Sequence, residues 1–356
     1  MLKRSPRVTF STSPPSETNV RFKLTQVRGD IPKGEGLRES PYMSKRIVAY
    51  IHSHPCHHLQ YDVLQGGRHV IVHFIIFDKV NRKKYDDYMQ HILQVFFVLN
   101  HFSYRKCIKS QEFHIYLYMT PFEKVLPCCN KTIGPDNVNT GVNIKDRECS
   151  SSHPEQTNEI TIYREEDWFK VLIHESIHSF RLDFPHAAKE EIYPLFPVKS
   201  EVNLFEAYTE FWAEMLNMMF CAIAMERRGN FDKVVKIMNV MVQVEKRFST
   251  FQAVKVLEHM GLRYDDLLRG NGVYVEESNV LAYFILKLCL LSHYNDFIGC
   301  CKKYCHNVLN FDEGKLHVII NFIKTYYKDG AFLEGIRKME SVKKDENAKM
   351  TLFELK

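Results

Sequence analysis

Two histidines with a glutamate beside the first are the residues of this chain whose types and spacing best suit chemistry. They lie in the segment Leu172-Ile173-His174-Glu175-Ser176-Ile177-His178. On a helix, side chains four residues apart lie on the same face, so both imidazoles can bind one metal ion. The pattern is HExxH, in which the glutamate is placed to act as a general base. The segment therefore predicts a zinc site with a basic carboxylate beside it.

The residues around the motif predict a helix to carry it. Glu165, Glu166 and Asp167 precede the motif, and acidic residues are favoured in the first turn of a helix. Apolar residues then recur at helical spacing, at Trp168, Val171, Leu172, Ile173, Ile177 and Phe180. The two histidines are thus expected on a mostly buried, amphipathic helix. There they could simply hydrogen-bond within a core, but their spacing favours a metal ion.

A catalytic zinc ion takes three protein ligands and leaves a fourth position for water, so two histidines need a third donor. The best source is the segment 203–216, which predicts a helix with Glu206, Glu210 and Glu214 on one face. Such a row of acids is usually a solvated face. Here the other faces are so aromatic and apolar that the helix is expected to be buried nearly all round, and buried carboxylates require a cation.

Asp183 and His186 remain possible third ligands. Asp183 lies soon after the second histidine, and His186 follows Pro185, where the chain is expected to turn. Neither has a spacing that is typical of a zinc site. In the long metzincin pattern, a glycine and a third histidine would stand where this chain has Arg181 and Phe184, which disfavours that pattern.

The motif and the second helix together resemble a known family. His174-Glu175-x-x-His178 followed by Glu206-x-x-x-Glu210 resembles the gluzincin branch of the zinc metallopeptidases, in which a glutamate on a second helix completes the site. Longer blocks resemble HExxH metallopeptidases encoded by large cytoplasmic DNA viruses, namely 116–127, 137–142, 168–184, 203–217 and 277–287. Gluzincins often have aspartate or a small residue after the third ligand. This chain has Glu210 there, so Glu206 and Glu210 both stay open as the ligand.

The gluzincin resemblance implies an α+β, zincin-like fold. An N-terminal half of sheet and helices would carry the HExxH helix, a C-terminal helical half would carry the third ligand, and the active-site cleft would lie between them. One zinc ion per chain would be bound by His174, His178 and Glu206, with Glu210 orienting a histidine. With Glu175 as general base, the resemblance implies hydrolysis of peptide bonds in a peptide or protein substrate.

A hydrogen-bond donor for the oxyanion is expected from the helical half. Tyr283 is the first choice and Tyr274 the second, although either tyrosine could simply be packed in the core. Asn139 and Gly141 are expected to line the cleft as an edge segment that pairs with the substrate backbone. The resemblance implies this placement, and strand addition makes it physically natural.

The rival function from another class is a catalytically silent structural or interaction protein, such as a virion component, that keeps a zincin fold. Zinc would then serve only to hold the two halves together. A structural site has no use for a general base. The presence of Glu175 therefore favours an enzyme.

Composition and periodicity predict one compact, helix-rich unit or two intimate subdomains. The 356 residues are 45% hydrophobic and include only 15 glycines and 13 prolines. The expected divisions are a disordered arm at 1–20, an α+β subdomain at 21–184, a helical subdomain at 185–342 and a solvated charged tail at 343–356. Strands are predicted at 69–77, 112–120 and 159–163, and helices at 85–102, 203–227, 233–260, 279–294 and 314–327.

Charge and hydropathy disfavour several classes of partner. The net charge is only +5 and the basic residues are scattered, so no nucleic-acid partner is expected. There is no secretory h-region, and the most apolar helices, 211–225 and 280–291, are too short and too interrupted to span a bilayer, so no membrane partner is expected. Ten cysteines without a signal peptide favour reduced thiols, and the expected location is the cytoplasm, or the virion if the protein is viral.

Two further clusters contain metal-binding residue types. Cys300-Cys301-x-x-x-Cys305-His306 could hold a second zinc ion but lacks paired C-x-x-C spacing, so ordinary buried helical cysteines are the simpler interpretation. The stretch His52-Ser53-His54-Pro55-Cys56-His57-His58 is crowded into one predicted loop. A packed turn or a fortuitous surface chelator is the simpler interpretation there.

Overall fold

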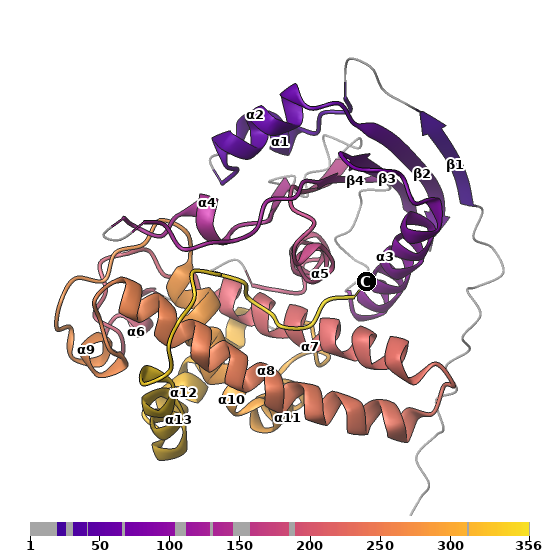
Figure 1. The fold of residues 1–356 in the computed structure, drawn as a ribbon. Coiled ribbons are helices and arrows are strands. Elements are labelled where there is room, and N and C mark those ends of the chain that lie inside the picture. Colours follow the sequence, from indigo (N-terminus) through magenta and orange to yellow (C-terminus); the bar gives the residue numbers. More distant parts are fainter. Residues whose placement is uncertain are drawn as a thin grey trace, which may run out of the picture.

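The structure, a computed structural model, describes residues 20–25, 31–40, 42–65, 68–103, 112–128, 131–144, 157–184, 189–311 and 313–355. The expected disordered arm lies outside the described residues except for Val20, which begins the first strand. Pro185 and His186 also lie outside them. The α+β class predicted from the sequence is confirmed, because one sheet and many helices make up the described chain (Figure 1).

One mixed sheet forms the first part of the fold. Its strands are β1 (Val20–Thr25), β2 (His57–Gln65), β3 (Arg68–Ile76), β4 (Glu112–Met119), β5 (Gly141–Ile144) and β6 (Thr157–Ile162). Their order in the sheet is β1-β2-β3-β4-β6-β5. The strands β3, β4 and β6 are parallel, while β1 and β2 on one side and β5 on the other pair antiparallel with their neighbours. The short strand β5 is therefore an edge of the sheet.

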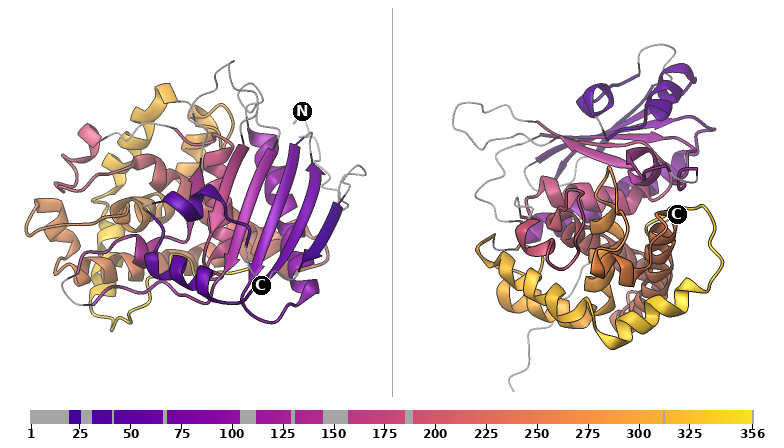
Figure 2. Two further views of the ribbon diagram at one scale, coloured as in Figure 1. Left: turned by 90° about the horizontal axis from the view of Figure 1, so that it is seen from above. Right: turned by 90° about the vertical axis from the view of Figure 1, so that its left-hand side faces the viewer.

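Helices cover both faces of the sheet (Figures 1 and 2). On one face lie α3 (Arg82–Phe102), which connects the parallel strands β3 and β4, and α5 (Trp168–Ser179), which follows β6. Alternate residues of β3 such as Val72 and Phe74 are buried against these helices. On the other face α1 (Glu35–Glu39) and α2 (Lys45–Ser53) pack over Ile75 and Tyr118.

After α5 the described chain is helical apart from connections. The helices are α6 (Lys189–Ile192), α7 (Leu204–Glu226), α8 (Phe231–His259), α9 (Tyr264–Arg269), the π-helix η1 (Leu281–Leu286), α10 (Lys287–Ser292), α11 (Tyr294–Tyr304), the short 3-10 helix η2 (Glu313–Lys315), α12 (Leu316–Tyr326) and α13 (Gly330–Glu340). Before them, α4 (Pro135–Val138) lies just ahead of β5. The long helix α7 packs directly on α5, so the two segments with metal-binding residues face each other (Figure 1). No helix of the described residues is long and apolar enough to cross a bilayer.

The expectation of one loop at 52–58 is wrong. His52 lies in the last turn of α2, and His57 and His58 begin β2. The alternation of buried Leu59, Tyr61 and Val63 shows why this segment is a strand, with His58 on the opposite side. His58 lies on the sheet beside His73, with 3.0 Å between the nitrogens Nε2 and Nδ1.

The expectation of a solvated tail at 343–356 is also wrong for most of its length. Lys343, Asp345 and Glu346 are exposed, but Ala348, Met350, Thr351 and Leu355 are buried. Backbone hydrogen bonds join this segment to the sheet side of the molecule. In one of them Ala348 N donates to Lys124 O at 2.9 Å. Asn217 Nδ2 of α7 donates to Phe353 O at 2.8 Å. The last residues therefore run between the two parts of the fold, because their backbone and apolar side chains find partners on both.

Candidate metal centre

The HExxH helix is buried on every side. All residues of α5, including His174 and His178, are buried between the sheet and α7. Opposite them, α7 presents Glu206 in its first turn and Glu210 one turn later. Glu210 and Glu214 are buried, so the acids of α7 do not form a solvated face.

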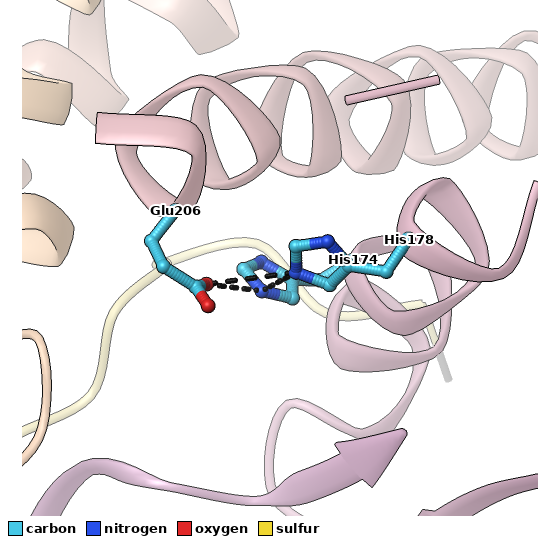
Figure 3. A group of neighbouring side chains, drawn as sticks. All are labelled: His174, His178 and Glu206. Carbon is cyan, nitrogen blue, oxygen red and sulfur yellow. Dashed lines mark hydrogen bonds and ion pairs between the residues drawn. The ribbon is translucent and has the colours of Figure 1, made fainter. Parts of the chain in front are cut away.

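Three ligand atoms converge at the start of α7 (Figure 3). His174 Nε2 lies 3.1 Å from His178 Nε2 and 3.1 Å from Glu206 Oε2. His178 Nε2 lies 3.6 Å from Glu206 Oε2. Three protein atoms bound tetrahedrally to zinc at about 2.0–2.1 Å would be separated by about 3.3 Å. The group of His174, His178 and Glu206 therefore has the spacing and the burial of a set that can hold one metal ion.

The outer nitrogens of both histidines are held by carboxylates. His174 Nδ1 lies 2.9 Å from Glu210 Oε2, and His178 Nδ1 lies 2.7 Å from Asp183 Oδ2. An ionised carboxylate only accepts, so each Nδ1 carries the hydrogen and each Nε2 keeps its lone pair in the neutral ring. Asp183 thus lies on the far side of its histidine rather than at the converging atoms. Its contact orients His178.

Lysines distinguish Glu206 from Glu210 and Glu214. Glu210 Oε1 accepts from Lys170 Nζ at 2.6 Å, and its second oxygen faces His174. Glu214 Oε1 accepts from Lys287 Nζ at 2.5 Å. Each of these two buried carboxylates therefore has a lysine as its cation. Glu206 faces the two imidazoles, which makes it the carboxylate with room for a metal ion.

The charges of this group show what a metal ion would replace. Burial by itself lowers the pKa of His178, yet the carboxylates of Asp183 and Glu206 raise that pKa to about 10. Burial raises the pKa of Glu206, but His178 and His174 outweigh it and hold this pKa well below its ordinary value. Without a metal ion, protons on the imidazoles therefore balance the carboxylates. A divalent cation would do so in their place.

We expect the affinity for zinc to rise with pH. Zinc binds neutral imidazole, so the proton that Asp183 and Glu206 stabilise on His178 must leave when the metal enters. Below the pKa of His178, the apparent association constant should therefore rise about tenfold per pH unit, and more steeply where His174 also releases a proton. Competition with a chromogenic chelator at about pH 6, 7 and 8 measures this.

Asp183→Asn is the control for this pH dependence, because it removes one of the two carboxylates that raise the pKa of His178. Its zinc affinity should depend less steeply on pH. Equal zinc affinity of the wild-type protein at all three values would contradict the assigned protonation.

Glu175 lies beside the converging atoms, in a cleft of ≈ 270 Å³. The opposite wall is the edge strand β5, where Gly141 approaches α5 closely. A Cβ atom on Gly141 would lie 2.7 Å from Val171 Cγ1 and 3.0 Å from Glu175 Oε1, so only glycine fits. Asn143 of the same strand donates to the backbone oxygen of Glu175 at 2.8 Å. The edge strand is therefore fixed against the carboxylate that the sequence predicts as general base.

Tyr283 enters the cleft from the π-helix η1. Its hydroxyl donates to Glu206 Oε2 at 3.2 Å. Burial and the nearby glutamates raise its pKa well above the ordinary value, so the hydroxyl keeps its proton. The side chain of Asn279 is hydrogen-bonded to that of Tyr283, and its oxygen accepts from Asn203 Nδ2 at 2.8 Å. These two hydrogen bonds fix the position of the tyrosine ring. Tyr274 is not among the cleft residues and donates to Glu276 at 2.9 Å instead.

The structure also places Asn139 and Gly141 in the wall of the cleft. The side-chain oxygen of Asn139 accepts from Ser278 at 2.7 Å, and its backbone oxygen accepts from the buried Arg164 at 3.0 Å. Both bonds hold the segment that leads into β5.

Sequence reasoning missed Lys170, Asn143 and Asn279. The signal for Lys170 was a charged residue four positions before His174 on a helix that is otherwise predicted to be buried.

Neither of the other clusters forms a comparable group. Among the described residues, the set of His174, His178 and Glu206 is the one whose ligand atoms lie close enough together to share an ion. Cys300 and Cys301 lie in α11, and Cys305 follows it. The cysteines that the structure describes have free thiols.

We therefore expect a mild reductant to leave both the melting temperature and the zinc content of the protein unchanged. A protein that depended on a disulfide would lose about 2–5 kcal/mol of stability on reduction. Thermal denaturation and metal analysis with and without reductant measure the two quantities. A large fall in melting temperature, or zinc near two ions per chain, would contradict this expectation.

Comparison with known proteins gives no relative: no protein-family model, no curated protein and no solved structure matches the chain.

Proposed function

We propose that the protein is a zinc metallopeptidase of the gluzincin type that hydrolyses peptide bonds in peptides or proteins. The observation that carries the proposal is the convergence of His174, His178 and Glu206 within 3.6 Å of one another, with Glu175 beside them in one cleft. Two imidazoles and one carboxylate are a donor set typical of catalytic zinc, which keeps an open position for water. The cleft has residues of both the sheet part and the helical part in its walls, which supports a zincin-like arrangement.

The bound zinc would supply Lewis acidity and a water of lowered pKa. Glu175 would take the proton of that water and deliver it to the leaving amine. Tyr283, whose hydroxyl keeps its proton, would donate a hydrogen bond to the oxyanion once it turns from Glu206. Glu210 and Asp183 hold the two imidazoles in the orientation that presents Nε2.

The edge strand β5 would bind the substrate backbone. Its neighbour β6 pairs with one side of it, and Asn139, Thr140 and Gly141 line the cleft. An extended peptide can add to such an edge through main-chain hydrogen bonds. A peptide bound in this way would present its scissile carbonyl between Glu175 and Tyr283.

A peptide library tests the proposal directly. The purified full-length protein, loaded with zinc, should cleave a subset of peptides, lose this activity with a chelator and regain it with added zinc. A protein that binds zinc stoichiometrically but cleaves no peptide of a diverse library would instead support the catalytically silent alternative.

Gly141→Ala should lower turnover about ten- to hundredfold, because a displacement of ~1 Å near reacting groups has effects of that size. The added methyl group would meet Val171 and Glu175 and push β5 from α5 or turn the carboxylate. Zinc content should be unchanged, since the atoms nearest to the added methyl group belong to Val171 and Glu175 and not to the three ligands. Turnover on a cleaved peptide and metal analysis measure both effects.

Gly299→Ala is the matched control for this substitution. Gly299 lies in α11, where an added Cβ atom meets nothing within 4 Å. Its turnover should equal that of the wild-type protein. Equal turnover of Gly141→Ala and Gly299→Ala would show that β5 does not set the position of Glu175.

A further inference from the structure

The exposed apolar side chains of the described residues concentrate on one part of the surface. Six of the fourteen large ones lie between positions 223 and 244, at the end of α7 and along the first half of α8, namely Ile223, Met225, Phe231, Val235, Val240 and Val244. Met225 is 64% exposed and Phe231 is 67% exposed. We call the connection between the two helices with its flanking turns, 223–236, the hairpin tip.

The hairpin tip carries apolar side chains on more than one side. Ile223 and Met225 are two residues apart in α7, which puts them about 200° apart around the helix axis. Phe231 begins α8 on the other side of the turn. In Figure 1 this connection lies at the right-hand edge of the molecule, opposite α9. Such a tip buries little area against a flat protein surface, whereas the interface of a bilayer can surround it.

Basic residues accompany these apolar side chains. Arg227, Arg228, Lys233 and Lys236 are exposed within the hairpin tip. The acids there are Asp232 and Glu226, and Glu226 accepts from the backbone nitrogens of Arg228 and Asn230. The tip thus combines apolar groups with a positive net charge, a combination that binds surfaces of anionic lipid.

We propose that the hairpin tip is a peripheral membrane-binding site for anionic lipid bilayers. The apolar side chains enter the interface and the basic ones contact the lipid headgroups. The sequence-based expectation of no membrane partner rested on the absence of a spanning helix, and a surface-bound hairpin needs none. The proposal does not rest on peptidase activity, because the tip lies outside the cleft.

Sedimentation of the full-length protein with vesicles tests this proposal. It should bind vesicles of phosphatidylcholine with about 30% phosphatidylserine and bind pure phosphatidylcholine at least about tenfold more weakly. Binding should fall as salt rises from about 50 mM to about 500 mM, because screening weakens the attraction.

The double variant Met225→Ser and Phe231→Ser should bind the anionic vesicles at least about tenfold more weakly, since two apolar side chains no longer enter the bilayer. Val273→Ser is the matched control. Val273 is 67% exposed, like Phe231, but follows α9, which lies opposite the hairpin tip in Figure 1. Wild-type binding that does not distinguish the two lipid mixtures would overturn the proposal. Unchanged binding of the double variant would also overturn the proposal. The same holds if the tip mediates only self-association of the protein in solution.

Discussion

Glu206→Ala should be isolated essentially free of zinc. Glu206 is the carboxylate of α7 that faces both Nε2 atoms, and its loss leaves only two protein ligands for the metal. Residual zinc would be lost during purification, and the variant would therefore not hydrolyse peptides. Metal analysis of the purified variant measures the effect, and a melting curve shows that the protein is still folded.

Glu210→Gln is the matched variant one turn along α7. Glu210 contacts the outer nitrogen of His174 and Lys170, so its substitution weakens the orientation of a ligand without removing one. Loss of such an orienting group typically costs about 10- to 100-fold in affinity or activity. This variant should therefore keep zinc and turn over slowly. If Glu210→Gln were metal-free and Glu206→Ala fully loaded, the two roles would have to be exchanged.

Glu175→Gln should keep about one zinc ion per chain and lower turnover by on the order of 10² or more, the usual scale for a lost general base. Glutamine has the same shape and still fills the space beside Gly141, so the cleft should not collapse. Turnover and zinc content are measured on the same preparation. Hydrolysis at the wild-type rate would rule out Glu175 as the base, and loss of zinc would make it a ligand instead.

The helices of the site could be predicted from the sequence because their signals are local. Apolar periodicity located α5 and α7, and the spacing of His174 and His178 on one helix gave two of the three converging atoms. The third atom could not be decided in this way. Glu206 and Glu210 lie a turn apart on the same face, so periodicity treats them alike.

Contacts between distant segments decide what periodicity leaves open. Lys170 donates a hydrogen bond to Glu210, whereas Glu206 faces the imidazoles. Nothing local in the sequence predicts that Lys170 pairs with Glu210. Asp183 is a candidate ligand by its closeness in sequence, yet the end of α5 directs it to the outer nitrogen of His178. The charges of the last residues predict a solvated tail. Their partners, such as Lys124 and Asn217, are far away in the chain.

X-ray absorption at the zinc edge of the purified protein reports directly which atoms surround the metal. We expect one zinc ion per chain with two imidazole nitrogens and carboxylate or water oxygens at about 2.0–2.2 Å, and no sulfur. Glu206→Ala should lose this signal. Zinc–sulfur distances of about 2.3 Å, or a wild-type protein that holds no stoichiometric metal, would contradict a centre built from His174, His178 and Glu206.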